Sequence, residues 1–132
     1  MTYKTKIDPK IVDRVLNLAT TSTHDTKMGC VITDRRGRIV AEATNMHKTH
    51  PLQHRHAVKV QQPNKVYLHA EIAALVKCRE QGHTLYVGRW RGDGIIGLAK
   101  PCPICFSAIH EAGIREVVYT ESGGKLTVLF VD

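Results

Sequence analysis

The most informative parts of this sequence are two short stretches, His69-Ala70-Glu71 and Pro101-Cys102-Pro103-Ile104-Cys105. Each opens a segment whose apolar residues recur at helical spacing, 71–78 in the first case and 104–112 in the second. Each predicted helix follows a predicted strand, and the loops that leave the carboxyl ends of strands meet at one edge of an open α/β sheet. We therefore expect the two helix N-termini to face each other and to bring His69, Cys102 and Cys105 together.

These residue types suit a zinc ion. One imidazole and two thiolates form a good zinc-binding set, and three protein ligands leave the fourth position open, which separates a catalytic zinc from a structural one. A helix N-terminus also lowers the pKa of a thiol and favours the thiolate that binds metal. Glu71 is placed to act beside the metal, taking a proton from water and passing it to the substrate. The set predicts hydrolysis of a carbon–nitrogen bond in an electron-poor ring.

Two other interpretations exist for this motif. A redox pair would use the two cysteines but gives no task to the histidine and the glutamate. A structural zinc would need a fourth protein ligand, for which His24, Cys30 and Cys78 are the candidates outside segment 46–65. We expect Cys30 in a strand and Cys78 on the apolar face of a helix, both as buried core thiols.

The rest of the chain predicts short elements of alternating type. Asp8 is a suitable N-cap and Pro9 fits the first position of a first helix. Gly82 and Gly113 are placed to end the second and third helices. The predicted elements are a helix over 9–19, strands over 28–33 and 39–44, a loop over 46–65, a helix over 71–78, a strand over 84–88, a Gly-rich loop over 89–100, a helix over 104–112, and strands over 116–120 and 126–131.

This order predicts an α/β fold. The turn over 34–38 joins the first two strands into an antiparallel hairpin. Helices alternating with strands in the middle of the chain imply crossovers and a largely parallel central sheet. The turn over 122–124 is too short for a crossover, so we expect the last two strands to pair antiparallel. With 132 residues, we expect one domain over residues 1–132.

The composition is typical of a folded, basic protein. Hydrophobic residues make up 42% of the chain and charged residues 23%, which argues against global disorder. The formal net charge of +7 favours an anionic partner, such as a nucleotide, a polynucleotide or a phosphate-bearing surface. The apolar runs are too short for a membrane span, and residues 1–6 lack the apolar stretch of a secretory signal. We therefore expect a cytoplasmic protein without a membrane partner.

Basic residues dominate one part of the chain. No Asp or Glu occurs between Ala43 and Ala70, a stretch that contains Lys48, Arg55 and Lys65. The length and the two prolines of segment 46–65 indicate a functional or disordered loop. One interpretation is a solvated basic loop, and the other is a lid or cradle for phosphate.

The two motifs together resemble those of the zinc-dependent cytidine and deoxycytidylate deaminases. The similarity extends over most of the chain: 28–32 resembles the family's first strand, Thr44-Asn45 a strand end, and 113–119 the segment after the cysteines. The resemblance implies a three-layer α/β/α fold with a five-stranded mixed sheet, and a homo-oligomer. It also implies that zinc is bound by His69, Cys102 and Cys105, and that Glu71 carries the proton during attack on C4 of cytosine, which gives uracil and ammonia.

The resemblance also suggests substrate contacts. The backbone N–H of Ala70 would hold the base and Asn45 the ribose, although Asn45 also suits a turn. Trp90 could stack on a base or cap the core. Pro101 is a further candidate, and Lys100 could neutralise a phosphate.

Several departures from the family pattern leave the substrate open. Ala73 stands where deoxycytidylate deaminases often have Asn, and Lys100 where the family often has a small or acidic residue. Tyr67-Leu68 stand where adenine-specific tRNA deaminases tend to have Pro-Thr-Ala. A free nucleotide fits best because Lys100 and Arg89 could neutralise one phosphate, so we expect conversion of dCMP to dUMP. The alternatives are a base in RNA or single-stranded DNA, a purine nucleoside or nucleotide, and a non-enzymatic structural-zinc module.

Overall fold

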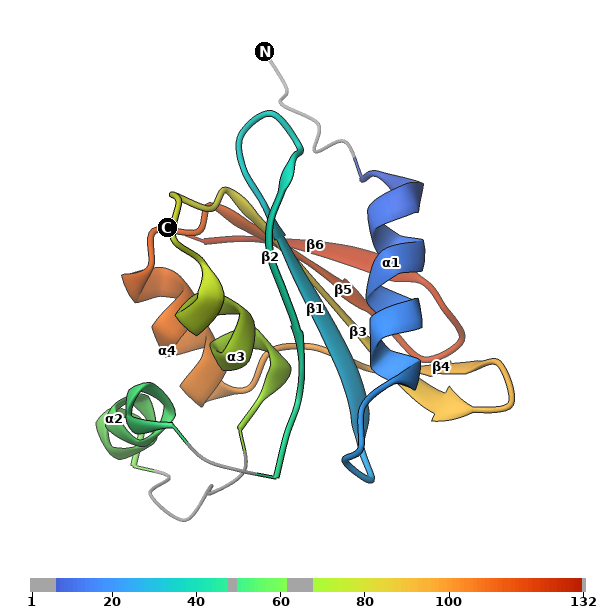
Figure 1. Ribbon diagram of the computed structural model, residues 1–132, viewed down its shortest axis with the longest axis horizontal. Coiled ribbons are helices and arrows are strands. Elements are labelled where there is room, and N and C mark those ends of the chain that lie inside the picture. The colour runs from blue at the N-terminus through green and yellow to red at the C-terminus, as the bar shows by residue number, and fades with distance from the viewer. Residues whose placement is uncertain (1–6, 48–49, 62–67, 132) are drawn as a thin grey trace.

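The computed structural model describes residues 7–47, 50–61 and 68–131. Helices flank a central sheet along these residues (Figure 1). In chain order the elements are α1 (Pro9–Thr20), β1 (Lys27–Thr33), β2 (Ile39–Thr44), α2 (Pro51–Lys59), α3 (Ala70–Lys77), β3 (Thr84–Gly92), β4 (Ile95–Gly97), α4 (Pro103–Glu111), β5 (Glu116–Thr120) and β6 (Leu126–Phe130).

The sheet has the strand order β2-β1-β3-β5-β6, with the short β4 paired to β3. The β1–β2 hairpin and the antiparallel β5–β6 pair confirm the sequence predictions. The prediction of a largely parallel sheet is wrong, because β3 and β5 are the only parallel neighbours among the described strands. The cause is strand order: β1 lies between β2 and β3 and is antiparallel to both, so β2 and β3 run the same way without touching. The predicted count of five strands omits β4.

Three layers result, as predicted. Helix α1 packs on one face of the sheet, and α3 and α4 lie on the other (Figure 1). Because side chains alternate along a strand, neighbouring residues point to opposite faces of the sheet and pack into different cores. Val31, Tyr86 and Val118 pack with α1, whereas Ile32 and Leu85 belong to the core under α3 and α4.

Helix α1 begins where the sequence predicts. Asp8 is the N-cap, its carboxylate accepts the Lys10 N–H at 3.0 Å, and Pro9 fills the first helical position. The helix lies very close to β1: a Cβ added to Gly29 would lie 2.3 Å from the Val15 carbonyl oxygen. Glycine at position 29 therefore permits the contact between helix and strand.

The prediction of a loop over 46–65 is wrong for its middle part, which forms α2. The Nδ1 of His50 caps this helix by accepting the Leu52 N–H at 3.0 Å, and Pro51 occupies the first turn. The buried side chains of α2 are Gln53, His56 and Ala57, so no apolar period marks the helix in the sequence. Lys48 and Lys65, the ends of the predicted basic cradle, lie outside the described residues.

Two other boundaries differ from prediction. Much of the predicted loop over 89–100 is sheet, because β3 continues to Gly92 and turns back into β4. Helix α3 ends at Lys77, well before Gly82, which leaves Cys78 half-buried at its C-cap. Gly113 does follow α4 and has the positive φ of 77° predicted for a helix end. No helix among the described residues has the length and hydropathy to cross a bilayer.

Candidate metal centre

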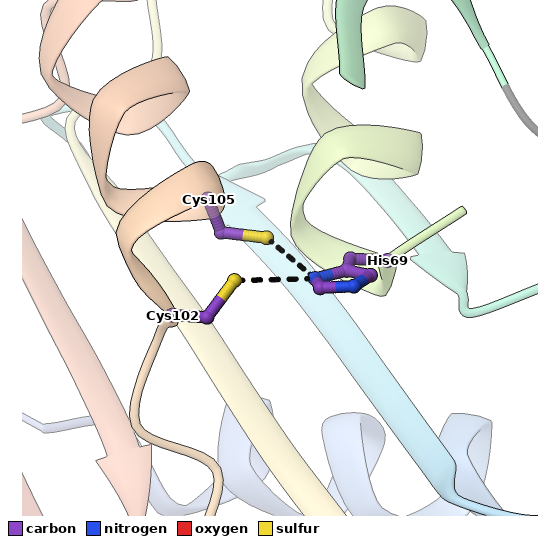
Figure 2. A group of neighbouring side chains, drawn as sticks. All are labelled: His69, Cys102 and Cys105. Carbon is purple, nitrogen blue, oxygen red and sulfur yellow. Dashed lines mark hydrogen bonds between the residues drawn. The ribbon is translucent and has the colours of Figure 1, made fainter. Parts of the chain in front are cut away.

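The N-termini of α3 and α4 meet as the sequence predicts. His69 is the N-cap of α3 and Cys102 the N-cap of α4, with Cys105 one turn further along α4. Figure 2 shows the three side chains converging, with Nδ1 of His69 lying 3.1 Å from the Cys105 sulfur and 3.4 Å from the Cys102 sulfur. One donor atom from each residue lies within 4.8 Å of the others, and no other such group occurs in the described part of the chain.

The two cysteines are electrostatically unequal. A hydrogen bond from the Cys105 thiol is the main cause that lowers the pKa of Cys102 to about 4, against the opposing effect of burial. Burial raises the pKa of Cys105 well above that of an ordinary thiol. This hydrogen bond places the two sulfurs side by side, where a divalent ion would bind both. One imidazole and two sulfurs at this spacing fit zinc.

Glu71 lies in the first turn of α3, two residues after His69. Its side chain is 3% exposed, and it is buried in the core of the molecule. Burial raises the pKa of its carboxyl group, and the nearby His69 opposes that rise. A raised pKa makes a carboxylate a stronger proton acceptor, which suits a group that takes up and gives back a proton.

A pocket of about 160 Å³ opens beside these groups. Of the predicted substrate contacts, Asn45, Ala70 and Lys100 line it, whereas Trp90 and Pro101 are not part of its described lining. Trp90 lies on β3, opposite Lys27 of β1, and Pro101 is buried beside Cys102. The described lining consists of Thr26, Met28, Asn45, His69, Ala70, Glu71, Arg89, Leu98, Lys100 and Cys102.

Asn45 is buried, and its amide is held by β1 and by the segment before it. Its Oδ1 accepts the Ser22 hydroxyl at 2.6 Å and the Met28 N–H at 3.1 Å, while its Nδ2 donates to the Thr26 carbonyl. These bonds fix one wall of the pocket and restrict the ways in which Asn45 can meet a ligand.

Two cations border the pocket. Arg89 is half-buried and Lys100 is exposed, and neither forms a salt bridge with a described residue. Glu71 is the one acidic side chain in the described lining.

A larger groove of about 960 Å³ lies at another edge of the sheet, beside Arg35 and Arg115, but it contains none of the metal donors. The candidate site is therefore identified by the metal donors and the buried carboxyl group. The volume of a pocket does not identify it.

The other candidate ligands are not part of this donor group. Cys30 is fully buried, as predicted for a core thiol. Cys78 is half-buried rather than buried, because α3 ends just before it. His24 stacks on His47 with ring centroids 4.6 Å apart. Among the described residues, the group of donors thus remains one histidine and two cysteines.

Sequence reasoning missed Gln53 and His56, which approach the site from α2. Both are fully buried polar side chains. The one local indication of their helix is His50-Pro51, an N-cap followed by a proline suited to the first turn.

Comparisons with known proteins agree with this geometry. The sequence profile described as "Cytidine and deoxycytidylate deaminase zinc-binding region" matches residues 5–121. Two solved structures of dCMP deaminase from the cyanophage S-TIM5 are similar to this chain. The apo form has 23% identity and a TM-score of 0.56, and the alignment covers 87% of this chain and 86% of that one. The complex with dCMP and dUMP has 25% identity and a TM-score of 0.55, covering 88% and 85%. No curated protein matches the chain.

The profile match spans most of the chain, including both motifs and the strands between them. The fold agrees with that of the phage enzyme, and the converging donors suit the metal that the family uses. This chain therefore belongs to the family of zinc-dependent cytidine and deoxycytidylate deaminases, and it is a hydrolase of that type.

Proposed function

We propose that this enzyme converts dCMP to dUMP and ammonia. The observation that carries the proposal is the buried Glu71 beside His69, Cys102 and Cys105, at a small pocket bordered by two cations. The phage structure solved with dCMP and dUMP supports the same substrate class at 25% identity.

In the proposed reaction, His69, Cys102 and Cys105 hold zinc. Zinc in such a site supplies Lewis-acid activation of water near neutral pH. Glu71 would take one proton from the water that attacks C4 of cytosine and pass it to ring N3 as the C4–O bond forms. It would then take the second proton, from the oxygen now on C4, and pass it to the amino group as the C4–N bond breaks and ammonia leaves, so that Glu71 neither gains nor loses a proton overall. The burial that raises the pKa of Glu71 suits this alternation.

The surrounding residues are proposed to orient the substrate. Ala70 occupies the first turn of α3, where backbone N–H groups point out of the helix and can bind a ligand. Asn45 would contact the sugar from the fixed wall of the pocket. The predicted contacts of Trp90 and Pro101 stay predictions, because neither side chain borders the described pocket.

Phosphate recognition is assigned to Lys100, with Arg89 beside it. The pocket is smaller than the roughly 300–1,000 Å³ typical of sites for drug-sized ligands, so it suits a base and leaves a phosphate at the rim. Lys100 is exposed at that rim and has no carboxylate partner among the described residues. A charge-assisted hydrogen bond from Lys100 to the phosphate would favour dCMP over deoxycytidine.

A substrate screen tests the proposal. Purified zinc-loaded enzyme is incubated with cytidine, deoxycytidine, their monophosphates, and adenine and guanine nucleotides, and ammonia release is measured. We expect kcat/KM to be highest for dCMP. Release of ammonia from a purine nucleotide instead, or from none of these compounds, would reject dCMP as the substrate.

The remaining expectations concern partners and location. Action on RNA or single-stranded DNA stays an alternative, and α2 weakens it because Gln53 and His56 of the basic segment are buried and Arg55 pairs with Glu111. Polynucleotide binding that falls steeply with salt would favour it. The homo-oligomer and the cytoplasmic location stay predictions, and sedimentation would test the former.

A further inference from the structure

Helix α2 reaches the metal centre through a buried amide. The side-chain Oε1 of Gln53 accepts the backbone N–H of His69 at 2.7 Å. Gln53 is fully buried. His69 is the N-cap of α3, so its backbone sets both where that helix starts and where the imidazole points. The Gln53 oxygen therefore acts on the backbone of a proposed metal ligand.

One turn further along α2, a second buried side chain reaches the other half of the centre. His56 is fully buried; its Nδ1 lies 2.8 Å from the Ser107 hydroxyl and its Nε2 lies 2.9 Å from a Glu111 carboxylate oxygen. Ser107 and Glu111 both belong to α4, the helix that carries Cys102 and Cys105. Arg55 of α2 adds an ion pair to the same Glu111 oxygen.

We propose that α2 is a brace that positions the metal donors, with Gln53 as the positioning residue for the histidine and His56 as the positioning residue for the cysteine helix. This proposal rests on the assignment of His69, Cys102 and Cys105 as the zinc ligands. Figure 1 shows α2 beside α4, on the side away from the sheet. The brace joins two segments that are distant in the sequence and that supply all three donors.

Physical reasoning explains why such a brace matters. Three donors on two separate helices bind an ion tightly only when the helices keep their relative position. The His69 N–H is partly buried, and without the Gln53 oxygen it loses this hydrogen bond, so the His69 backbone would move to find another partner. Groups that orient metal ligands from behind typically change metal affinity 10- to 100-fold when they are removed.

The test removes the acceptor oxygen and keeps the side-chain volume. In Gln53→Met, we expect the zinc dissociation constant, measured by competition with a chromophoric chelator, to rise about 10- to 100-fold. In the metal-free variant, we also expect faster hydrogen exchange of the His69 amide specifically, measured by NMR. The matched control is Ala57→Gly, which weakens the same helix from another buried position and should leave both measurements near wild type.

His56→Leu tests the contact between α2 and α4. This variant also provides the test if Gln53→Met does not fold. It should weaken zinc binding and change the visible spectrum of the cobalt-substituted protein, because the cobalt–thiolate geometry follows α4. The brace is rejected if both folded variants bind zinc within twofold of wild type, or if Ala57→Gly weakens binding equally. If wild type and Cys105→Ser bind zinc alike, the ligand assignment itself fails, and the brace fails with it.

Discussion

Both faces of the sheet bury apolar and polar side chains, but the metal donors lie on one face only, that of α3 and α4. The face under α1 holds apolar groups such as Val15 and Val118, the close approach at Gly29, and a buried Thr84 that hydrogen-bonds to Glu116. The opposite side, from α3 and α4 out to α2, buries Glu71, Gln53 and His56. Burying a polar or ionisable group lowers stability unless it is fully satisfied, whereas apolar burial raises it. The comparison indicates that α1 mainly stabilises the fold, while the other face carries the chemistry.

The largest expected effect is on the chemical face. Glu71→Gln should lower kcat by about 10²- to 10⁴-fold, because it removes the proposed proton carrier. Zinc content, measured by atomic absorption, should stay at the wild-type level, since Glu71 is not assigned as a ligand. Loss of the metal together with the activity would show that its role has been misassigned.

The same variant makes a prediction about stability. The raised pKa of Glu71 means that folding of the metal-free protein disfavours the ionised carboxylate relative to the unfolded chain. Ionising this group therefore opposes folding, and that penalty grows as pH rises above its unfolded-state pKa. Metal-free Glu71→Gln should unfold at the same temperature as metal-free wild type or higher at neutral pH, in thermal scans followed by circular dichroism. A lower unfolding temperature would contradict the division of roles between the two faces.

The opposite outcome is expected on the α1 face. Gly29→Ala places a Cβ against the Val15 carbonyl and within 2.8 Å of the Ala19 backbone nitrogen. Overpacking of this kind lowers the free energy of unfolding by about 1–3 kcal/mol. Denaturant titration should show this loss, while kcat per folded molecule stays at the wild-type value. A fall in kcat without a loss of stability would break the proposed separation.

A smaller effect is expected at the rim of the pocket. Lys100→Gln should raise KM for dCMP about tenfold, as expected for loss of a charge-assisted hydrogen bond, and leave KM for deoxycytidine unchanged. Lys125→Gln is the matched control. Lys125 is also exposed, it lies just before β6, and its substitution changes the net charge by the same amount. Equal effects of both substitutions would indicate general attraction by the positive charge of the protein rather than a phosphate contact.

The metal donors could be predicted from the sequence because both motifs are local. Each one starts a helix, and the spacing of Cys102 and Cys105 places both sulfurs on one side of one turn. The β1–β2 and β5–β6 pairs followed from short turns between predicted strands, whereas the three layers followed from the resemblance of the two motifs to a known family.

The features that the sequence did not predict, helix α2 and the strand order, depend on contacts between distant parts of the chain. Helix α2 buries Gln53 and His56 because their partners, His69, Ser107 and Glu111, come from α3 and α4. A polar inward face removes the hydrophobic period by which a helix is recognised. Strand order is equally non-local: hydrophobic periodicity identifies β1, but it does not reveal that β1 lies between β2 and β3.

The smallest expected effect concerns the ion pair between α1 and β2. The Arg14 Nε donates to a Glu42 oxygen at 2.8 Å, and this hydrogen bond is the main cause that lowers the pKa of Glu42. Because the folded-state pKa is depressed, the contribution of the pair is present above the unfolded-state pKa and is lost as pH falls through the folded-state value. Glu42→Gln should therefore lower the unfolding temperature slightly at neutral pH and not at all in strong acid.

The partial exposure of both side chains keeps this difference small, and added salt should reduce it further. If Glu42→Gln lowered the stability as much as Gly29→Ala does, the ion pair rather than close packing would hold α1 to the sheet. A small, salt-sensitive loss would instead assign the stability of this face to the contact at Gly29, where an added Cβ has no room.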